Sequence, residues 1–265
     1  MNNLIEFELF KQHKHITHGY TTRLEGASQG AFASLNMGFN RGDAEENVIE
    51  NYRRVTKTLG LSTQQLVLSD QIHSDVVMAV DERHLGMGIT KKSQIKGVDG
   101  LMTDKPGVGL TTFYADCVPL FFYDPIHQAI ALSHSGWRGT VKKIGLKTLD
   151  QMRQHYGTNP EEVLIGIGPA IGQCCYEVSK DVKKEFDLSF NDDIIAKIMS
   201  PTPKNSEKYM LNLKLANQLM FKEAGVKASN IEVSSLCTSC HDELFFSHRR
   251  MGASRGSHVA IFALR

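Results

Sequence analysis

Hydrophobic residues recur at helical spacing in four parts of the chain. Apolar positions predict a helix over residues 46–59, with Gly60 supplying the stop. The clearest amphipathic pattern predicts a helix over residues 140–156. Similar patterns predict two further helices, over residues 179–186 and 211–224.

Short apolar runs bounded by turn residues predict buried strands. Residues 65–80 read as an extended segment of mixed polarity, and the polar, proline-containing stretch 200–208 is predicted to be a mobile loop. Helices and strands alternate without a regular βαβ rhythm, which favours a mixed sheet. We therefore expect an α/β fold: a single layered domain over residues 1–265, with mixed β-sheets flanked by helices. The predicted strands are residues 109–112, 118–123, 129–133, 163–167, 231–236 and 258–264.

Charge and length narrow the function classes. The 265 residues include 30 Lys and Arg against 29 Asp and Glu, for a net charge of +1. This balance disfavours a dedicated nucleic-acid or membrane-surface protein. No apolar run has the length of a transmembrane helix, and the first ten residues do not resemble a secretion signal. We expect a soluble, cytoplasmic protein that is a monomer or a homodimer.

The cysteines favour chemistry over structural disulfides. The chain has five of them, an odd number in a chain long enough to fold without covalent cross-links. Cys237 and Cys240 form a CxxC pair followed by His241, and we expect them to be ordinary loop cysteines, with a structural metal or a redox disulfide as the alternative. The adjacent Cys174 and Cys175 are expected to pack in the interior.

Three candidate metal ligands lie next to predicted strands. His73 and His134 each end an apolar run, and Cys117 precedes one. Strand ends commonly line clefts. Two imidazoles and one thiolate suit zinc, and three protein ligands leave the fourth tetrahedral position open, as in catalytic sites. The alternative is that the two histidines are ordinary loop residues and the cysteine is a small buried side chain.

An anion site is predicted beside these ligands. His134, Trp137 and Arg138 fall within a short glycine-containing run directly before a predicted helix. Free backbone N–H groups at a helix start, together with an arginine, suit a phosphate. Arg138 is therefore the candidate phosphate ligand, and Trp137 is expected to fill the core.

Motifs along most of the chain occur in an order that resembles the multicopper polyphenol oxidase, or laccase-domain, family. That family is also described as one of zinc-dependent purine nucleoside phosphorylases. Two departures from the usual family pattern are His248 before an arginine pair and the closing segment 253–256. The matching motifs are residues 18–23, 34–38, 42–43, 47 with 51, Gln71-Ile72-His73, Asp99-Gly100-Leu101, Ala115-Asp116-Cys117-Val118-Pro119, 134–139, 167–171, Cys174-Cys175-Tyr176-Glu177-Val178 and 245–250.

The resemblance implies layered mixed sheets and zinc held by His73, Cys117 and His134. It implies phosphorolysis of adenosine, inosine, guanosine and 5′-methylthioadenosine, together with adenosine deamination. Purine nucleosides and inorganic phosphate are thus the expected partners, and no nucleic acid or membrane is expected. Copper, the metal of the family's earlier label, is the alternative to zinc. The residues expected to bind substrate are Asn36, Arg53, Arg138 and Arg249.

Three other functions stay open at this point. Cys117 could be a nucleophile activated by a histidine, in a hydrolase that edits cell-wall precursors. Copper-dependent polyphenol oxidation is disfavoured because one cysteine and two histidines make a single metal site, whereas dioxygen reduction by a laccase needs several coppers. A non-enzymatic zinc protein would need a fourth protein ligand, for which His18 and His241 are the candidates. We further expect Asp116 either to orient a ligand or to cap a turn.

Overall fold

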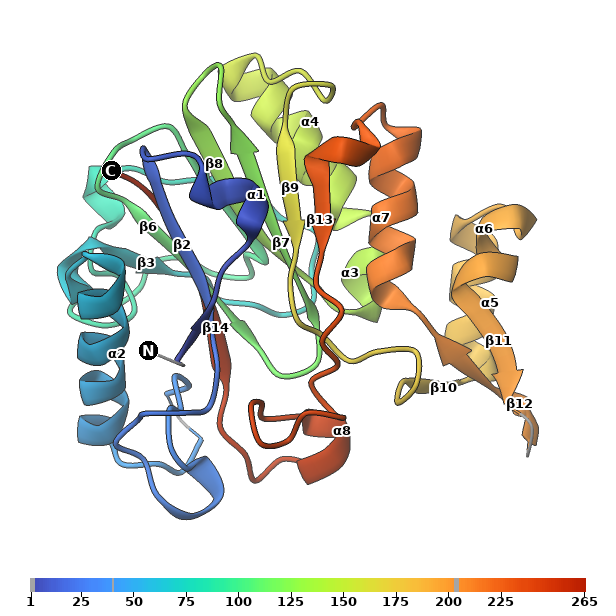
Figure 1. Ribbon diagram of the computed structural model, residues 1–265, viewed down its shortest axis with the longest axis horizontal. Helices are drawn as coiled ribbons and strands as arrows, with labels where there is room; N and C mark the ends of the chain where they lie inside the picture. Colours follow the sequence, from blue (N-terminus) through green and yellow to red (C-terminus); the bar gives the residue numbers. More distant parts are fainter. Residues whose placement is uncertain (1–2, 40, 203–204) are drawn as a thin grey trace.

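The computed structural model describes residues 3–39, 41–202 and 205–265 and contains three β-sheets (Figure 1). Six strands form the central sheet, which mixes parallel and antiparallel pairs. In spatial order they are β13 (Ile231–Val233), β9 (Leu164–Ile167), β7 (Val118–Asp124), β8 (Ala129–Ser135), β5 (Gly100–Thr103) and β4 (Val77–Ala79). The mixed α/β fold expected from the sequence is confirmed.

Two other sheets accompany the central one. The five-stranded sheet consists of β1 (Leu4–Ile5), β2 (Ile16–Thr21), β14 (His258–Leu264), β6 (Gly109–Tyr114) and β3 (Leu66–Leu68). The three-stranded sheet, on the right of Figure 1, consists of β10 (Glu177–Ser179), β12 (Asn205–Leu211) and β11 (Met199–Thr202).

Helices cover the outer faces of the two large sheets (Figure 1). The α-helices are α1 (Glu8–Lys11), α2 (Glu45–Leu59), α3 (Trp137–Val141), α4 (Ile144–Tyr156), α5 (Lys180–Ser189), α6 (Asp192–Ile198), α7 (Leu213–Glu223) and α8 (His248–Met251). Short 3₁₀ helices span Gly30–Phe32, Thr63–Gln65, Glu82–His84 and Ala228–Asn230. None of the described helices is long and apolar enough to span a bilayer.

The sequence of β7 shows how the layers pack. Leu120 and Phe122 belong to the core beneath α4 and α7, whereas Phe121 and Tyr123 belong to the core between the two large sheets. Successive residues of a strand point to opposite faces, so a strand buried on both sides reads as a continuous apolar run. This explains why β7 could be predicted from the sequence within one residue.

The strand predicted over residues 231–236 ends at Val233, and two other predicted segments differ in kind from the structure. The helix expected over residues 140–156 is two helices, because Lys143 has a left-handed backbone (φ 60°) that breaks the hydrogen-bond ladder between α3 and α4. The expected mobile loop at residues 200–208 is wrong: β11 and β12 pair antiparallel there, with Ser200 opposite Met210. Residues 203–204 of that stretch lie outside the described residues.

Candidate functional site

The side chains of His73, Cys117 and His134 converge at one end of the central sheet. Their ligand atoms all lie within 4.8 Å of one another, and Cys117 Sγ is 3.9 Å from His73 Nε2. His73 comes from the turn between β3 and β4, Cys117 from the turn before β7, and His134 from β8. The structure thus brings together the three residues that the sequence singled out as candidate metal ligands.

Two turns that carry these residues have unusual backbone conformations. His73 has φ 61° and Asp116 has φ 89°, both in the left-handed region that residues with a side chain seldom occupy. Such conformations cluster at functional sites and persist only where surrounding contacts hold them. Asp116 is held at both carboxylate oxygens, by the Thr238 hydroxyl at 2.6 Å and by the Arg249 backbone N–H at 2.7 Å.

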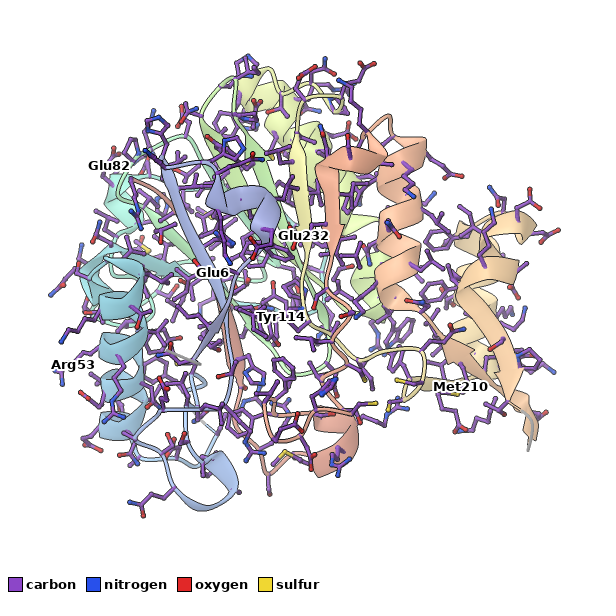
Figure 2. All side chains as sticks on the ribbon, viewed as in Figure 1. Glu6, Arg53, Glu82, Tyr114, Met210 and Glu232 are labelled. Atoms are coloured by element: carbon purple, nitrogen blue, oxygen red, sulfur yellow. The ribbon has the colours of Figure 1, made fainter. Side chains whose placement is uncertain are left out.

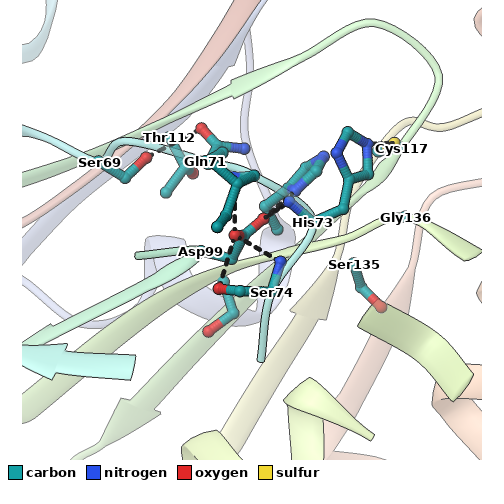
Figure 3. A network of polar contacts seen from close by, with 12 residues as sticks. Ser69, Gln71, His73, Ser74, Asp99, Thr112, Cys117, Ser135 and Gly136 are labelled. Atoms are coloured by element: carbon teal, nitrogen blue, oxygen red, sulfur yellow. Dashed lines mark hydrogen bonds and ion pairs between the residues drawn. The ribbon is translucent and has the colours of Figure 1, made fainter. Parts of the chain in front are cut away.

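The Asp99 carboxylate organises the His73 turn (Figure 3). It accepts hydrogen bonds from the backbone N–H groups of Ile72, His73 and Ser74, at 2.8–3.1 Å. The same carboxylate lies 2.8 Å from His134 Nδ1. Because Nδ1 is engaged in this contact, His134 Nε2 remains the nitrogen able to bind a cation. Asp99 therefore positions both histidines.

The electrostatics of the three ligands are coupled. Burial opposes ionisation of the Cys117 thiol, but the charges and hydrogen bonds of His134 and His73 outweigh it and lower the pKa of Cys117 to about 6. Burial also opposes protonation of His134, but Cys117 and Asp99 outweigh it and raise the pKa of His134 to about 9. Each of these two groups therefore favours the charged form of the other.

The space around these ligands fits a divalent cation. Two imidazoles and one thiolate form a donor set that suits zinc or copper. Gly136 leaves room for the ligand side chains, because a Cβ at this position would lie 2.9 Å from Cys117 Sγ and 3.0 Å from His73 Cδ2. Neither His18 nor His241 belongs to this described group of three ligands. His18 instead accepts a hydrogen bond from the Phe7 backbone N–H at 2.8 Å.

A cavity of about 400 Å³ opens onto the three ligands. It combines apolar and aromatic walls, from Phe39, Leu68, Ile95 and Phe113, with a basic group of residues. The basic residues are Arg41, Lys96 and Arg255.

Arg255 is the most informative of the basic residues in the cavity. Its side chain is buried, and its Nε has no hydrogen-bond partner in the part of the chain that the structure describes. A buried guanidinium with a free donor favours an anionic ligand. Arg41 and Arg255 lie in loops from opposite ends of the chain, and no sequence pattern predicted that they would meet.

The substrate-binding residues expected from the sequence are more scattered. Asn36 is buried and holds the cavity wall: its Oδ1 accepts from the backbone N–H groups of Gly38 and Ser257, both at 2.9 Å. Arg53 lies on the outer face of α2, with 68% of its side chain exposed, and does not line the cavity (Figure 2).

Arg138 and Arg249 also lie outside the cavity wall. The Arg138 guanidinium stacks 4.2 Å above the Trp137 ring and lines a separate hollow with Trp137 and Val141. Trp137 itself is only partly buried, packed at the edge of the core.

Arg249 is held by a backbone carbonyl: its Nη1 donates to the Glu177 carbonyl at 2.7 Å. The helix start expected after Gly139 lies earlier in the chain: α3 begins at Trp137, so Arg138 lies within the first turn of α3.

Comparisons with known proteins identify the family of this chain. The sequence profile described as "Multi-copper polyphenol oxidoreductase laccase" matches residues 17–265. The chain belongs to this family. It is 39% identical to "Purine nucleoside phosphorylase YlmD" of Geobacillus stearothermophilus over 93% of this chain and 89% of that protein. It is 33% identical to "Adenosine deaminase RL5" of an unknown prokaryotic organism, over 89% of each chain.

Solved structures show the same fold. The crystal structure of the Bacillus licheniformis hypothetical protein YfiH matches with a TM-score of 0.93 and 35% identity, covering 100% of this chain and 97% of that one. YlmD from Geobacillus stearothermophilus matches with a TM-score of 0.90 and 34% identity, covering 100% of both chains. The relatives named purine nucleoside phosphorylase and adenosine deaminase support an enzyme of this family.

Proposed function

We propose that the protein is a zinc-dependent purine nucleoside phosphorylase. Its substrates would be adenosine, inosine, guanosine and 5′-methylthioadenosine, and it would also deaminate adenosine. The observation that carries the proposal is that one cavity is lined both by three side chains able to hold a metal ion and by the buried Arg255, whose Nε has no hydrogen-bond partner among the described residues. The names of the relatives supply the substrate class.

The metal would be held by His73, Cys117 and His134, with Asp99 orienting His134 from behind. When bound, zinc would act as a Lewis acid that polarises a substrate oxygen or water in the cavity. Asp99 keeps the Nε2 lone pair of His134 directed toward the cation, and the low pKa of Cys117 favours its thiolate form. Copper remains the alternative metal, since the same donor set suits it.

Phosphate would bind between Arg41 and Arg255. Both line the cavity, and their charges lie close enough that Arg41, together with the larger effect of burial, lowers the pKa of Arg255. A phosphate dianion relieves this repulsion and gives Arg255 Nε an acceptor. These contacts favour Arg41 and Arg255 over Arg138, which lines a different hollow.

With phosphate held by Arg41 and Arg255, phosphorolysis would be a displacement at the ribose. An oxygen of the phosphate held by the arginines attacks C1′ of the ribose. The C1′–N9 bond breaks, and its electron pair leaves with the purine, which takes up a proton. The products are ribose 1-phosphate and the free base. The volume of about 400 Å³ lies in the range of small-molecule sites, and the aromatic wall suits a purine ring.

Deamination would use the same cavity without phosphate. Water attacks C6 of adenosine, and the exocyclic amine leaves as ammonia with the transferred proton, which gives inosine. The two reactions therefore differ in their need for Arg41 and Arg255.

The test combines metal analysis with two assays. We expect purified protein to contain zinc and to release hypoxanthine from inosine only when phosphate is present. Cys117→Ala should lose at least about a hundredfold in kcat/KM with both inosine and adenosine. Arg255→Gln should raise the KM for phosphate about tenfold while adenosine deamination persists. Full activity of Cys117→Ala in both assays would remove the proposal.

A second candidate function is a Cys/His hydrolase acting on cell-wall precursors. The observation that favours it is the lowered pKa of Cys117 beside His134. The two functions respond differently to chelation. A hydrolase of this kind keeps its activity after metal removal and is inactivated by thiol alkylation, with a trapped acyl intermediate on Cys117.

Polyphenol oxidation receives less support from the structure. The metal-ligating groups found among the described residues are the His73 group and a cluster made only of cysteines. A laccase needs several coppers bound largely by histidine.

A further inference from the structure

The four cysteines outside the proposed active site gather at one point. The Sγ atoms of Cys174, Cys175, Cys237 and Cys240 all lie within 4.8 Å of one another. Cys240 Sγ is 3.5 Å from Cys174 Sγ and 3.4 Å from Cys175 Sγ. This outcome corrects the expectations that Cys174 and Cys175 pack in the interior and that Cys237 and Cys240 are ordinary loop cysteines. Cys174 and Cys240 are in fact exposed.

Backbone pairing brings the two cysteine segments together. β9 and β13 are parallel neighbours in the central sheet, and the loops that follow them carry the two cysteine pairs. The pairing continues beyond the strands, because Ala170 and Cys237 form a parallel bridge and the Thr238 N–H donates to the Ala170 carbonyl at 3.1 Å. Backbone pairing, and not side-chain rotation alone, therefore brings the four thiols together.

We propose that Cys174, Cys175, Cys237 and Cys240 form a second metal site, a closed tetrathiolate site that holds one structural zinc ion. Four thiolates around zinc lie at about 2.3 Å from the metal, which places neighbouring sulfurs about 3.8 Å apart. Two of the observed separations, 3.5 and 3.4 Å, lie slightly below this value, and none of them exceeds 4.8 Å. The Cys237-x-x-Cys240 spacing is also typical of structural zinc sites.

The surroundings of the cluster suit a thiolate site. The Gly172 backbone N–H donates to Cys237 Sγ at 3.1 Å, the kind of contact that orients a metal-bound ligand. Gly172 also makes room for the sulfurs, since a Cβ there would lie 3.1 Å from Cys174 Sγ.

A positive charge is also available to offset the thiolates. Lys214 is buried with its ammonium bonded to the Ser234 and Leu236 carbonyls, and it interacts electrostatically with Cys237 and Cys174. Four thiolates around Zn²⁺ carry a net charge of about −2, which this ammonium partly offsets.

A disulfide explains the arrangement less well. One disulfide to Cys240 would use either Cys174 or Cys175 and would leave two thiols beside it with no role. Zinc uses all four sulfurs and leaves no open position, so this site would not itself react with substrate.

The position of the cluster gives it a structural role beside the active site. Thr238 lies between Cys237 and Cys240 in the sequence, and its hydroxyl donates to Asp116, the residue before Cys117. Ile171, near the other cysteine pair, donates its N–H to the Asp116 carbonyl at 2.9 Å. A metal that fixes both loops would therefore fix the turn that presents Cys117.

The experiment counts zinc in full-length protein purified under reducing conditions with zinc supplied. We expect Cys174→Ser/Cys240→Ser, which changes the two exposed thiols, to hold one zinc per chain fewer than wild type. Cys117→Ser changes the other cluster, so any zinc that it loses should add to the one lost by the double variant when the two sets of changes are combined. The double variant should also melt about 5–10 °C lower. Because the readout is the difference from wild type, it does not depend on whether the proposed active-site zinc is present.

A second measurement uses wild-type protein and needs no variant. After zinc loading, Cys174, Cys175, Cys237 and Cys240 should resist maleimide labelling, and a zinc chelator should expose all four, as read by peptide mass spectrometry. Labelling of these cysteines in zinc-loaded protein would overturn the proposal, as would a disulfide to Cys240 in that sample. An unchanged zinc count in a folded double variant would also overturn it.

Discussion

The two sulfur-containing clusters of this protein differ in ligand number and in what surrounds them. His73, Cys117 and His134 provide three ligands, of mixed type, at the floor of a cavity of about 400 Å³. The four-cysteine cluster provides four ligands of one type in two paired loops, and its residues do not line that cavity. Three ligands beside a cavity leave room for a substrate, whereas four ligands complete a tetrahedron. The comparison teaches that ligand count and access to a cavity are the features by which a reactive site would differ from a structural one.

The largest effect should come from filling the space that the active-site ligands need. Gly136→Ala would place a methyl group 2.9 Å from Cys117 Sγ and 3.0 Å from His73 Cδ2. Because the ligands must move apart, we expect a loss of about a hundredfold or more in phosphorolysis. Gly139→Ala is the matched control three residues later, where the nearest atom lies at 3.3 Å. Equal activities of the two variants would contradict the geometry described for the ligands.

A smaller effect is expected from the carboxylate behind His134. Asp99→Asn weakens the contact to His134 Nδ1 and the hold on the His73 turn, so the affinity for zinc should fall about 10–100-fold in a chelator competition. Asp124→Asn changes an equivalent carboxylate, 2.8 Å from His127 Nδ1 and outside both clusters. If both variants bind zinc like wild type, Asp99 does not position the ligand.

Thiol reactivity should distinguish the clusters in metal-free, reduced protein. Histidine contacts lower the pKa of Cys117 to about 6 despite burial, so its alkylation rate should rise about tenfold between pH 5 and pH 7 and then level off. Burial is the largest cause that raises the pKa of Cys174, so its alkylation should still be increasing above pH 9. Peptide mass spectrometry after timed iodoacetamide labelling reads both sites in one sample. Identical pH profiles would argue against the electrostatic difference.

The smallest effect should come from the hydrogen bond that links the clusters. Thr238→Val leaves one Asp116 oxygen without its partner at 2.6 Å, so the free energy of unfolding should fall by about 1–2 kcal/mol and kcat/KM by a few-fold. Thr103→Val removes another buried hydroxyl, which donates to the Val80 carbonyl at 2.7 Å. The control should lose similar stability in a urea titration and keep wild-type kcat/KM. Loss of activity in both variants would mean that Thr238 acts through stability alone.

Much of the secondary structure could be predicted from the sequence because several elements are buried or amphipathic along their whole length. The helix predicted over residues 46–59 is α2, which starts one residue earlier and ends at Gly60 in a left-handed conformation. β14 spans the predicted residues 258–264. The strand pair in residues 200–208 was missed because its polar sequence carries no apolar alternation, and its stability depends on β10 and β12 pairing across the chain.

The candidate active site could be predicted only in part. His73, Cys117 and His134 could be predicted because each lies beside an apolar run and because they belong to motifs of the family. Arg41 and Arg255 could not be predicted, because residues so far apart in the sequence come to line one cavity only in the tertiary structure. Conversely, Arg53 has a residue type suited to phosphate, yet it lies on the exposed face of α2.

The sequence by itself determined the chemistry available to this protein: the two imidazoles and the thiol of a candidate metal site, the buried strands beside them, and membership of a recognisable family. Tertiary structure decided which groups meet. Cys175 and Cys240 are 65 residues apart, and only the parallel pairing of β9 with β13 brings their sulfurs to 3.4 Å. The physical reason is that periodicity records a residue's local environment, whereas the meeting of distant loops depends on how whole strands pair and pack.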